Sequence, residues 1–190
     1  MHTRATTAPP CRPIDTRKSS PIAGVTERMM ALDEYRRKRS FTKTSEPRGR
    51  KVNSATGRVF VVQHHLASHE HHDFRLELDG VLKSWAVPKL VSTTPGVRRL
   101  AVQVEDHPLA YATFKGRIPE GQYGAGTVSI YDHGTWEPEE DPYEGLTSGK
   151  LAFRLKGRKL KGNWVLVRTA RGREKSEKPQ WLLIKRKPEA

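Results

Sequence analysis

The stretch that decides the fold of this chain reads Gln63-His64-His65-Leu66-Ala67-Ser68-His69-Glu70-His71-His72-Asp73-Phe74-Arg75-Leu76-Glu77-Leu78. From His71 onward, polar and apolar side chains alternate with a period of two, which is the pattern of a β-strand with two different faces. The polar face carries His71, Asp73, Arg75 and Glu77. The pattern therefore predicts a strand that buries its apolar face and presents a row of titratable groups on the other.

The titratable groups in this stretch favour a metal or catalytic site. Five of the eight histidines fall between His64 and His72. Side chains two apart on one strand face start roughly 7 Å from each other, close enough for an imidazole and a carboxylate to bind one metal ion. A merely solvated strand face is the alternative, although such a face would more typically use Lys, Glu and Thr. His64, His69 and His72 remain open as bystanders.

Further short strands, separated by turn residues, continue along the chain. Asp79-Gly80 joins two of them and is the strongest short-range signal for a β-hairpin. The expected strands are Arg58–Gln63, Asp73–Leu78, Val81–Val87, Arg99–Glu105, Thr127–Asp132, Lys150–Lys156, Trp164–Arg168 and Trp181–Arg186. Because no long helical pattern lies between them, these roughly eight strands predict an all-β fold, an antiparallel β-barrel or sandwich.

Three zones differ in composition. Residues 1–23 are rich in Thr, Pro, Arg and Ser and predict a disordered basic tail. Residues 24–57 predict a short amphipathic helix over 25–38 and then a basic linker, because apolar residues recur there at helical spacing. This basic N-terminal part could grip nucleic acid as an arm, or it could only solubilise the chain. Residues 58–190 are expected to form the barrel domain.

The sequence also predicts whether two further parts of the chain lie at the surface or in the core. The acidic stretch Glu137–Glu144 is expected to be a surface loop. Trp164 and Trp181 lie in a basic part of the chain, where tryptophan is more often a core residue than a stacking surface.

Charge and cysteine content narrow the class of protein. The formal net charge is +14, from 35 Lys and Arg against 21 Asp and Glu, so the expected partner is a polyanion such as nucleic acid. A basic protein without such a partner is the alternative. The single cysteine, Cys11, excludes internal disulfides and any cysteine-based zinc site. No stretch resembles a membrane span or a secretory signal, so we expect a cytoplasmic protein with no membrane partner.

The segment from Phe60 to Trp136 resembles the 3′-phosphoesterase domain of bacterial DNA ligase D, the end-processing part of non-homologous end joining, which also occurs as stand-alone proteins. The matching blocks are His65, His71–Gly80, Trp85-Ala86-Val87-Pro88-Lys89, Val104-Glu105-Asp106-His107-Pro108, Ile118-Pro119-Glu120-Gly121 and Tyr123-Gly124-Ala125-Gly126. Trp181–Lys185 is similar to the closing strand of the family. The resemblance therefore covers most of the chain.

The resemblance implies a β-barrel that binds a divalent ion, typically manganese, and trims DNA 3′ ends. A family member removes a terminal 3′-ribonucleoside to leave a 3′-phosphate, and then hydrolyses that phosphate to a 3′-hydroxyl. The implied metal ligands are His65, His71 and Asp73. Since two histidines and a carboxylate suit several first-row ions, cobalt and zinc also remain open.

The resemblance also implies roles around the scissile phosphate. The matching catalytic residues are Arg75, His107, Tyr111, Glu77 and Lys89, and the expected substrate-binding residues are Arg39, Glu46 and Gln63. Implied partners are the 3′ ends of DNA in a primer-template or duplex, together with a separate DNA ligase and an end-binding factor.

The residues themselves suit phosphoester hydrolysis. A divalent ion and Arg75 would compensate the negative charge on the transferring phosphate. His107 could donate a proton or a strong hydrogen bond to the departing 3′ oxygen, which is otherwise a poor leaving group. A turn histidine is the alternative interpretation of His107.

One departure from the family lies before the barrel. The family typically has Arg-Asp-Phe there and then Thr and Glu-Pro, whereas this chain reads Arg39-Ser40-Phe41-Thr42-Lys43-Thr44-Ser45-Glu46-Pro47. Because serine carries no charge, we expect weaker support for ribonucleoside removal than for phosphate removal.

Two other function classes remain open. His71, Asp73 and His107 could form the two-histidine, one-carboxylate site of a non-haem Fe(II) oxygenase. That class requires an oxoacid pocket and gives no reason for the basic surface. A non-catalytic nucleic-acid-binding barrel with an incidental metal site is the third class. Release of inorganic phosphate from a 3′-phosphate-ended duplex would separate all three.

Overall fold

The computed structural model describes residues 32–49, 58–169 and 178–188. The described strands are β1 (Val59–Leu66), β2 (Glu70–Leu78), β3 (Val81–Val87), β4 (Arg98–Pro108), β5 (Gly116–Ile118), β6 (Gly126–Pro138), β7 (Lys150–Gly157), β8 (Lys161–Arg168) and β9 (Gln180–Lys185). Three short helical segments accompany them, namely α2 (Asp33–Arg37), the 3-10 helix η1 (Leu109–Thr113) and α3 (Pro142–Ser148).

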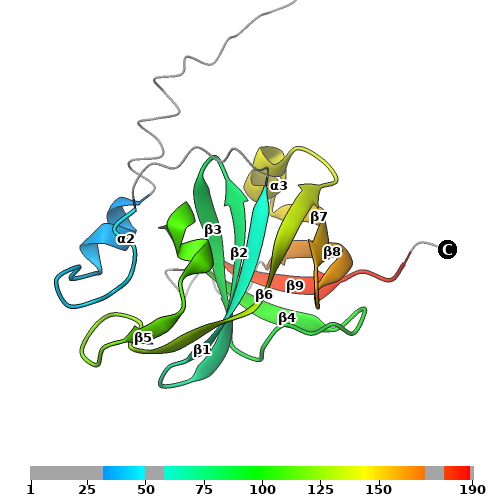
Figure 1. The fold of residues 1–190 in the computed structure, drawn as a ribbon. Helices are drawn as coiled ribbons and strands as arrows, with labels where there is room; N and C mark the ends of the chain where they lie inside the picture. The colour runs from blue at the N-terminus through cyan, green and yellow to red at the C-terminus, as the bar shows by residue number, and fades with distance from the viewer. Residues whose placement is uncertain (1–31, 50–57, 170–177, 189–190) are drawn as a thin grey trace, which may run out of the picture.

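The strands form one antiparallel sheet in the order β1-β2-β3-β4-β9-β8-β7-β6-β5. An additional pairing of β1 with β6 closes eight strands into a barrel, and β5 extends the sheet beyond β6 (Figure 1). The predicted all-β, eight-stranded antiparallel barrel is therefore confirmed. Every strand expected from the sequence is present, and β5 was not predicted because its three residues are too short to show a period.

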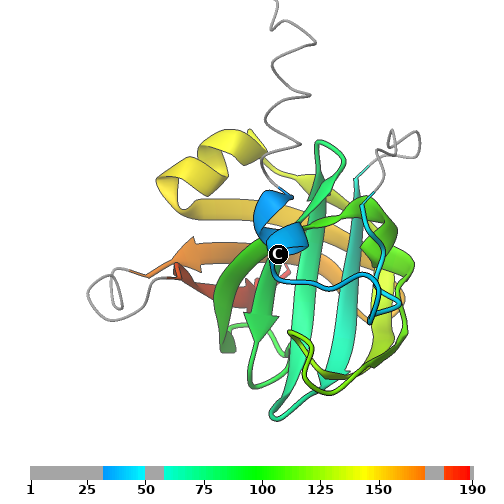
Figure 2. The same ribbon diagram turned by 90° about the vertical axis from the view of Figure 1, so that its left-hand side faces the viewer.

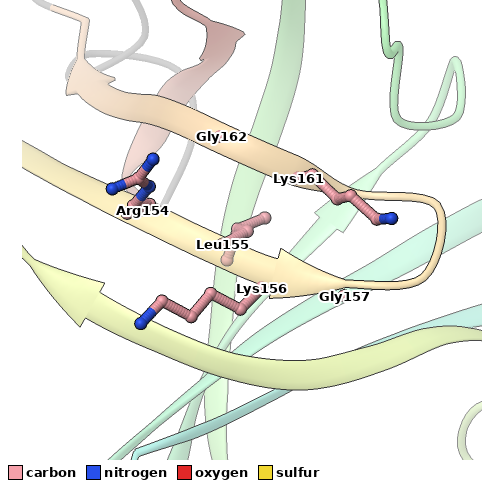
Figure 3. Close-up of a pocket in the computed structure, with 6 residues that line it drawn as sticks. All are labelled: Arg154, Leu155, Lys156, Gly157, Lys161 and Gly162. Carbon is pink, nitrogen blue, oxygen red and sulfur yellow. The ribbon is translucent and has the colours of Figure 1, made fainter.

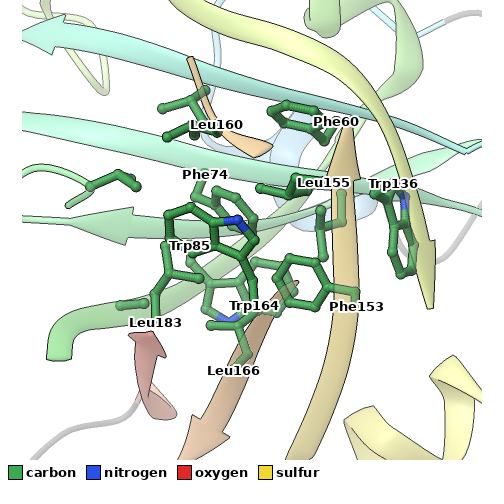
Figure 4. Packing of buried hydrophobic residues seen from close by; sticks show 14 of the residues in the cluster. Phe60, Phe74, Trp85, Trp136, Phe153, Leu155, Leu160, Trp164, Leu166 and Leu183 are labelled. Atoms are coloured by element: carbon green, nitrogen blue, oxygen red, sulfur yellow. The ribbon is translucent and has the colours of Figure 1, made fainter. Parts of the chain in front are cut away.

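The barrel interior is filled by large apolar side chains from all sides (Figure 4). Phe74 from β2, Trp85 from β3 and Trp164 from β8 are at most 1% exposed. Trp181 is equally buried, so the expectation that Trp164 and Trp181 belong to the core is confirmed. Since each such side chain contributes about 2 to 3 kcal/mol when fully buried, this core supports a rigid barrel wall.

Two turns depend on their backbone geometry. Asp79 and Gly80 both have positive φ, 56° and 77°, as a two-residue β-hairpin turn between β2 and β3 requires. Gly126 begins β6, where a Cβ atom would lie only 2.3 Å from the carbonyl oxygen of Leu66. Glycine at this position therefore permits the close approach of β1 and β6 that closes the barrel.

The outer face of β1, β2 and β3 is also buried. A second apolar cluster lies there, formed by Tyr35, Leu82, Tyr111, Phe114, Ile118 and Val128. Residues 32–49, which include α2, lie against this outer face (Figure 2). The hydroxyl of Tyr35 donates to the carbonyl of Pro47 at 2.7 Å and so ties this segment into a compact strap. The polar residues predicted to form the site share this covered outer face.

The loop and the helix that were expected outside the strands can be compared with the structure. The prediction of a surface loop over Glu137–Glu144 is wrong, because β6 continues to Pro138 and α3 begins at Pro142. Asp141 caps α3 by accepting from the N–H of Tyr143, and proline suits the first helical turn. The helix expected over 25–38 is seen from Asp33 to Arg37. Its earlier part and the tail 1–23 lie outside the described residues.

Within the described ranges, the helices are too short and too polar to cross a membrane.

Candidate metal and phosphate site

Three possible metal ligands meet at one end of the β1–β2 pair. The antiparallel register places His65 opposite His71 and Gln63 opposite Asp73. One ligand atom from each of His65, His71 and Asp73 lies within 4.8 Å of the other two. In the described part of the chain, this is the group of His, Cys, Asp and Glu side chains that could hold a metal ion.

The two histidines are oriented by backbone carbonyl groups. Nε2 of His65 lies 2.9 Å from the carbonyl oxygen of Gly124, and Nδ1 of His71 lies 2.9 Å from that of His69. A ring nitrogen facing a carbonyl carries the proton, so the opposite nitrogen of each ring keeps its lone pair. Those opposite nitrogens are the ones that face the carboxylate of Asp73.

This donor set fits a first-row divalent ion. The two ring nitrogens lie 3.6 and 3.8 Å from the Asp73 oxygens, too far for good hydrogen bonds but suited to ligands that share an ion. Backbone carbonyls that fix the ring orientation are the usual outer partners of metal-binding histidines. His65, His71 and Asp73 would therefore hold the metal.

The charge of Asp73 is stabilised by its neighbours. Burial opposes its ionisation, but the positive charge of Arg75 outweighs burial and holds the pKa of Asp73 below its usual range. Nη2 of Arg75 lies 3.2 Å from Oδ2 of Asp73. Asp73 is therefore a carboxylate throughout the neutral pH range.

This pKa shift predicts a pH-dependent contribution to stability. A carboxyl group with a lowered folded-state pKa stabilises the fold above its ordinary pKa, and the contribution is lost as the pH falls toward the folded-state value. Asp73→Asn should destabilise the metal-free protein by roughly 3 kcal/mol at pH 7, because Arg75 loses a buried partner. Urea unfolding in chelator should show that this difference shrinks below about pH 4. A constant difference down to pH 3 would contradict the stabilising role of the charge.

Arg75 is held rigidly beside the metal ligands. Its side chain is 2% exposed. Nε donates to Oε1 of Gln63 and Nη1 donates to Oγ of Ser84, both at 2.8 Å, while Nη2 faces Asp73. The guanidinium also lies 4.9 Å from the ring centroid of Tyr111. Arg75 thus presents a fixed positive charge next to the ion site.

Gln63 supports Arg75 and does not face the surface. It is fully buried, and its amide nitrogen donates to the carbonyls of Tyr111 and Phe114 at 3.1 and 2.9 Å. Both ends of its amide are thus engaged within the protein, and Gln63 connects η1 to Arg75. Its role in substrate binding stays a prediction.

His107 lies on β4 and is buried. Its Nδ1 donates to the carbonyl of Glu105 at 2.9 Å, and its Nε2 accepts from Nη2 of Arg39 at 3.1 Å. Burial and the positive charges of Arg75 and Arg39 lower the pKa of His107 well below its ordinary value. In this arrangement His107 is the partner of Arg39, and its role toward the leaving oxygen stays a prediction.

Arg39 connects the strap to the barrel. Its Nε donates to Oε1 of Glu46 at 2.8 Å, and its Nη1 donates to Oε1 of Glu105 at 3.2 Å. The same Glu46 oxygen accepts from the hydroxyl of Tyr111 at 3.0 Å. The structure therefore brings Arg39 and Glu46, which were expected to bind substrate, next to Tyr111 and His107, which were expected to be catalytic.

Glu105 is a site residue that the sequence analysis did not single out. Its carboxylate is 1% exposed and also accepts from Nζ of Lys38 at 3.0 Å. Burial opposes its ionisation, but the hydrogen bond from Lys38 and the nearby Arg39 lower its pKa. The sequence feature that could have identified Glu105 is its position two residues before His107, which places both side chains on one strand face. Part of the basic N-terminal charge is thus neutralised inside the protein.

Glu77 lies farther from the metal ligands, whereas Lys89 follows the end of β3 that pairs with β2 beside them. Glu77 accepts from the N–H of Gly80 at 2.7 Å and so caps the β2–β3 turn, four residues and about 13 Å along the strand from Asp73. Lys89 is exposed in the turn after β3, two residues beyond Val87, which pairs with His72. The structure shows a turn-capping position for Glu77 and leaves the side chain of Lys89 accessible.

The remaining histidines of the cluster do not join the metal group. Nε2 of His64 lies 2.6 Å from Oε1 of Glu70 at the surface. His72 points toward the core side, where its Nδ1 accepts from the N–H of Val91, and burial lowers its pKa to about 4. His69 contributes its carbonyl to His71. These three residues thus hold positions outside the ligand set.

A separate groove lies between β7 and β8 (Figure 3). Its volume is about 510 Å³, and it is lined by Arg154, Leu155, Lys156, Gly157, Lys161 and Gly162. None of the expected site residues lines this groove, so its cations add to the basic surface away from the metal ligands.

The geometry described above agrees with comparisons to known proteins. Residues 63–168 match the family described as the DNA ligase D 3′-phosphoesterase domain. The multifunctional non-homologous end joining protein LigD of Pseudomonas aeruginosa is 57% identical over 159 residues, which cover 82% of this chain and 18% of that protein.

Mycobacterial relatives give the same result. The multifunctional non-homologous end joining DNA repair protein LigD of Mycobacterium tuberculosis is 47% identical over 73% of this chain. The LigD protein of Mycolicibacterium smegmatis is 41% identical over the same share. The chain matches less than a fifth of the length of these relatives, 18% and 19%. This chain belongs to the DNA ligase D 3′-phosphoesterase domain family.

Proposed function

We propose that this protein is a metal-dependent phosphoesterase that removes a 3′-phosphate from a DNA end and leaves a 3′-hydroxyl. The observation that carries the proposal is the shared carboxylate of Asp73. This carboxylate faces the rings of His65 and His71 and also forms an ion pair with Arg75. A bound metal ion and the guanidinium of Arg75 would therefore lie on either side of the same carboxylate. Such a pair of positive groups is what a phosphoryl group requires as its charge is redistributed.

The metal ligands, Arg75 and His107 would each have a separate role in the reaction. A divalent ion held by His65, His71 and Asp73 would supply Lewis-acid activation of the phosphate. Arg75 would bind a nonbridging oxygen from a position fixed by Gln63 and Ser84, at no cost in reorganisation. His107, as a neutral acceptor, would orient the guanidinium of Arg39 toward the substrate.

Membership of the family and the names of its relatives support DNA ends as the substrate and end joining as the setting. The net charge of +14 suits a polyanion. Manganese is our proposed ion, with cobalt and zinc as the alternatives to test. A separate ligase and an end-binding factor would be the proposed partners in the same process.

The oxygenase alternative with His107 as a ligand differs from the group that lies together in the described residues. It required His107 to join His71 and Asp73, but the group in the described residues contains His65 instead. His107 directs its ring nitrogens at Glu105 and Arg39.

The decisive test is phosphate release. The purified protein is incubated with a duplex that ends in a 3′-phosphate, with manganese and with excess chelator in parallel. We expect inorganic phosphate only in the presence of the metal. An oxygenase or a non-catalytic binding barrel would release none, and full activity in chelator would overturn the metal mechanism.

Removal of a terminal ribonucleoside is the second proposed activity, and here Ser40 makes a specific prediction. Ser40 is exposed, and its Oγ lies 3.1 Å from Oγ1 of Thr42. Ser40→Asp would add a carboxylate next to Arg39. We expect this change to raise ribonucleoside release roughly tenfold, as a gained charge-assisted hydrogen bond would, and to leave phosphate release unchanged.

The measurement compares primer-templates that end in one ribonucleotide or in a 3′-phosphate. Ser40→Asn is the matched control, because it has the shape of aspartate without the charge. Strong ribonucleoside release by the native protein, unaltered by Ser40→Asp, would show that the serine does not limit this activity.

A further inference from the structure

Tyr123 lies at the edge of the site with much of its ring open to solvent. It belongs to the loop between β5 and β6, and 42% of its surface is exposed. The carbonyl of the next residue, Gly124, contacts Nε2 of the metal-ligating His65 at 2.9 Å. The ring of Tyr123 is therefore one residue away from a group that orients a metal ligand.

Two cations from the strap contact this ring. Nζ of Lys38 lies 4.9 Å from the ring centroid of Tyr123, and Cζ of Arg39 lies 5.5 Å from it. Both cations are themselves held by the buried carboxylate of Glu105. Because Arg39 also contacts His107, and Gly124 contacts His65, the groups around the ring reach both His107 and a candidate metal ligand.

The loop that carries Tyr123 is ordered by its own hydrogen bonds. The N–H of Gln122 donates to the carbonyl of Pro119 at 3.2 Å, and the N–H of Ala125 donates to the carbonyl of Gln122 at 3.1 Å. Tyrosine has only two side-chain torsions to fix, so a ring on such a loop loses little entropy on contact with a ligand. The position thus offers a prepared aromatic surface.

We propose that Tyr123 stacks on the nucleobase of the terminal nucleotide whose 3′-phosphate occupies the site. The inference rests on the proposed 3′-phosphoesterase function. In such a nucleotide only the sugar separates the base from the phosphate, so an aromatic ring next to groups that contact His65 and His107 is at the right range for the base. Because every base has a π face, this contact would hold the terminal nucleotide without a preference for its sequence.

The test compares a normal terminal nucleotide with one that lacks its base. Duplexes carry a 3′-phosphate on either a terminal deoxynucleotide or a terminal abasic tetrahydrofuran, and kcat/KM for phosphate release is measured with manganese. Tyr123→Leu should lower kcat/KM on the base-bearing end by roughly 5- to 100-fold, the range for one base–aromatic stacking contact. The same variant should leave the abasic end unchanged, and Tyr123→Phe should behave like the native protein on both.

Two results would overturn the stacking role. An equal loss on both ends for Tyr123→Leu would mean that the ring only supports Lys38 and Arg39. An equal loss for Tyr123→Phe and Tyr123→Leu would mean that the hydroxyl group acts and the ring face does not.

A binding measurement keeps this inference distinct from the proposed function. A duplex with 2-aminopurine at its 3′ terminus is titrated with protein in chelator, where no turnover is expected. Stacking should quench the fluorescence for the native protein and for Tyr123→Phe, but not for Tyr123→Leu. If quenching depends on the ring but no phosphate is released in the metal assay, only the proposed phosphoesterase function is contradicted. If phosphate is released but all three proteins give the same fluorescence, only the stacking role of Tyr123 is contradicted.

Discussion

Loss of His71 is expected to reduce phosphate release by at least about 100-fold, because even changes to the partners behind a metal ligand cost 10- to 100-fold. His71 would supply one of three ligands, and its Nε2 faces the shared Asp73 carboxylate. Its side chain is 21% exposed, so His71→Ala should leave the barrel folded. Metal content measured by elemental analysis should fall together with activity.

His64→Ala provides the matched control for this prediction. His64 is a histidine of the same strand pair, but its ring contacts Glu70 and lies outside the ligand group. We expect native activity and native metal content for this variant. If His71→Ala retained both properties as well, the three-residue metal site would be wrong.

The second large effect is expected at Arg75, where metal binding and catalysis should separate. Arg75→Ala removes the buried guanidinium that faces Asp73 and would bind the phosphate. Turnover should fall by roughly 100- to 1000-fold, the usual loss for one preorganised group that stabilises transition-state charge. The three metal ligands remain, so bound manganese should still be detected.

Ser84→Ala tests how far the contribution of Arg75 to turnover depends on the position of its guanidinium. This variant keeps Arg75 but removes the hydroxyl that accepts from Nη1. A smaller loss of kcat with unchanged metal content would support a positioning role for Ser84. Loss of metal from Arg75→Ala in proportion to its activity would instead assign Arg75 to the structure of the ion site.

The fold could be predicted from the sequence because its signals are local. The alternation from His71 to Leu78 set the two faces of β2, and Asp79-Gly80 set the hairpin to β3. The structure confirms both, with Phe74 and Leu76 in the core and Asp73 and Arg75 on the outer face. What alternation alone did not indicate is that the outer face is also covered.

The candidate metal site could be predicted only in part from the residues themselves. His71 and Asp73 share one strand face, so their proximity follows from strand geometry. His65 lies on another strand, and its place opposite His71 depends on the register of the β1–β2 pair. The resemblance to the family supplied that residue, and the structure brings it to the other two.

The network around Glu105 could not be predicted because its contacts are distant along the chain. Arg39 and Glu105 are 66 residues apart, and Tyr111 and Glu46 are 65 apart. No periodic pattern relates such positions. Short helices were difficult for a similar reason, since α3 depends on the capping of Asp141 more than on an apolar stripe.

The attachment of the strap has a consequence for how this module can be cut from a longer chain. The family match begins at residue 63, and the barrel itself begins at Val59. A fragment that started there would contain every proposed metal ligand, yet it would lack the cations that neutralise the buried Glu105. An unpaired buried carboxylate is strongly destabilising. The smallest autonomous unit therefore begins before Lys38, and truncations or gene fusions should place their junction upstream of Leu32.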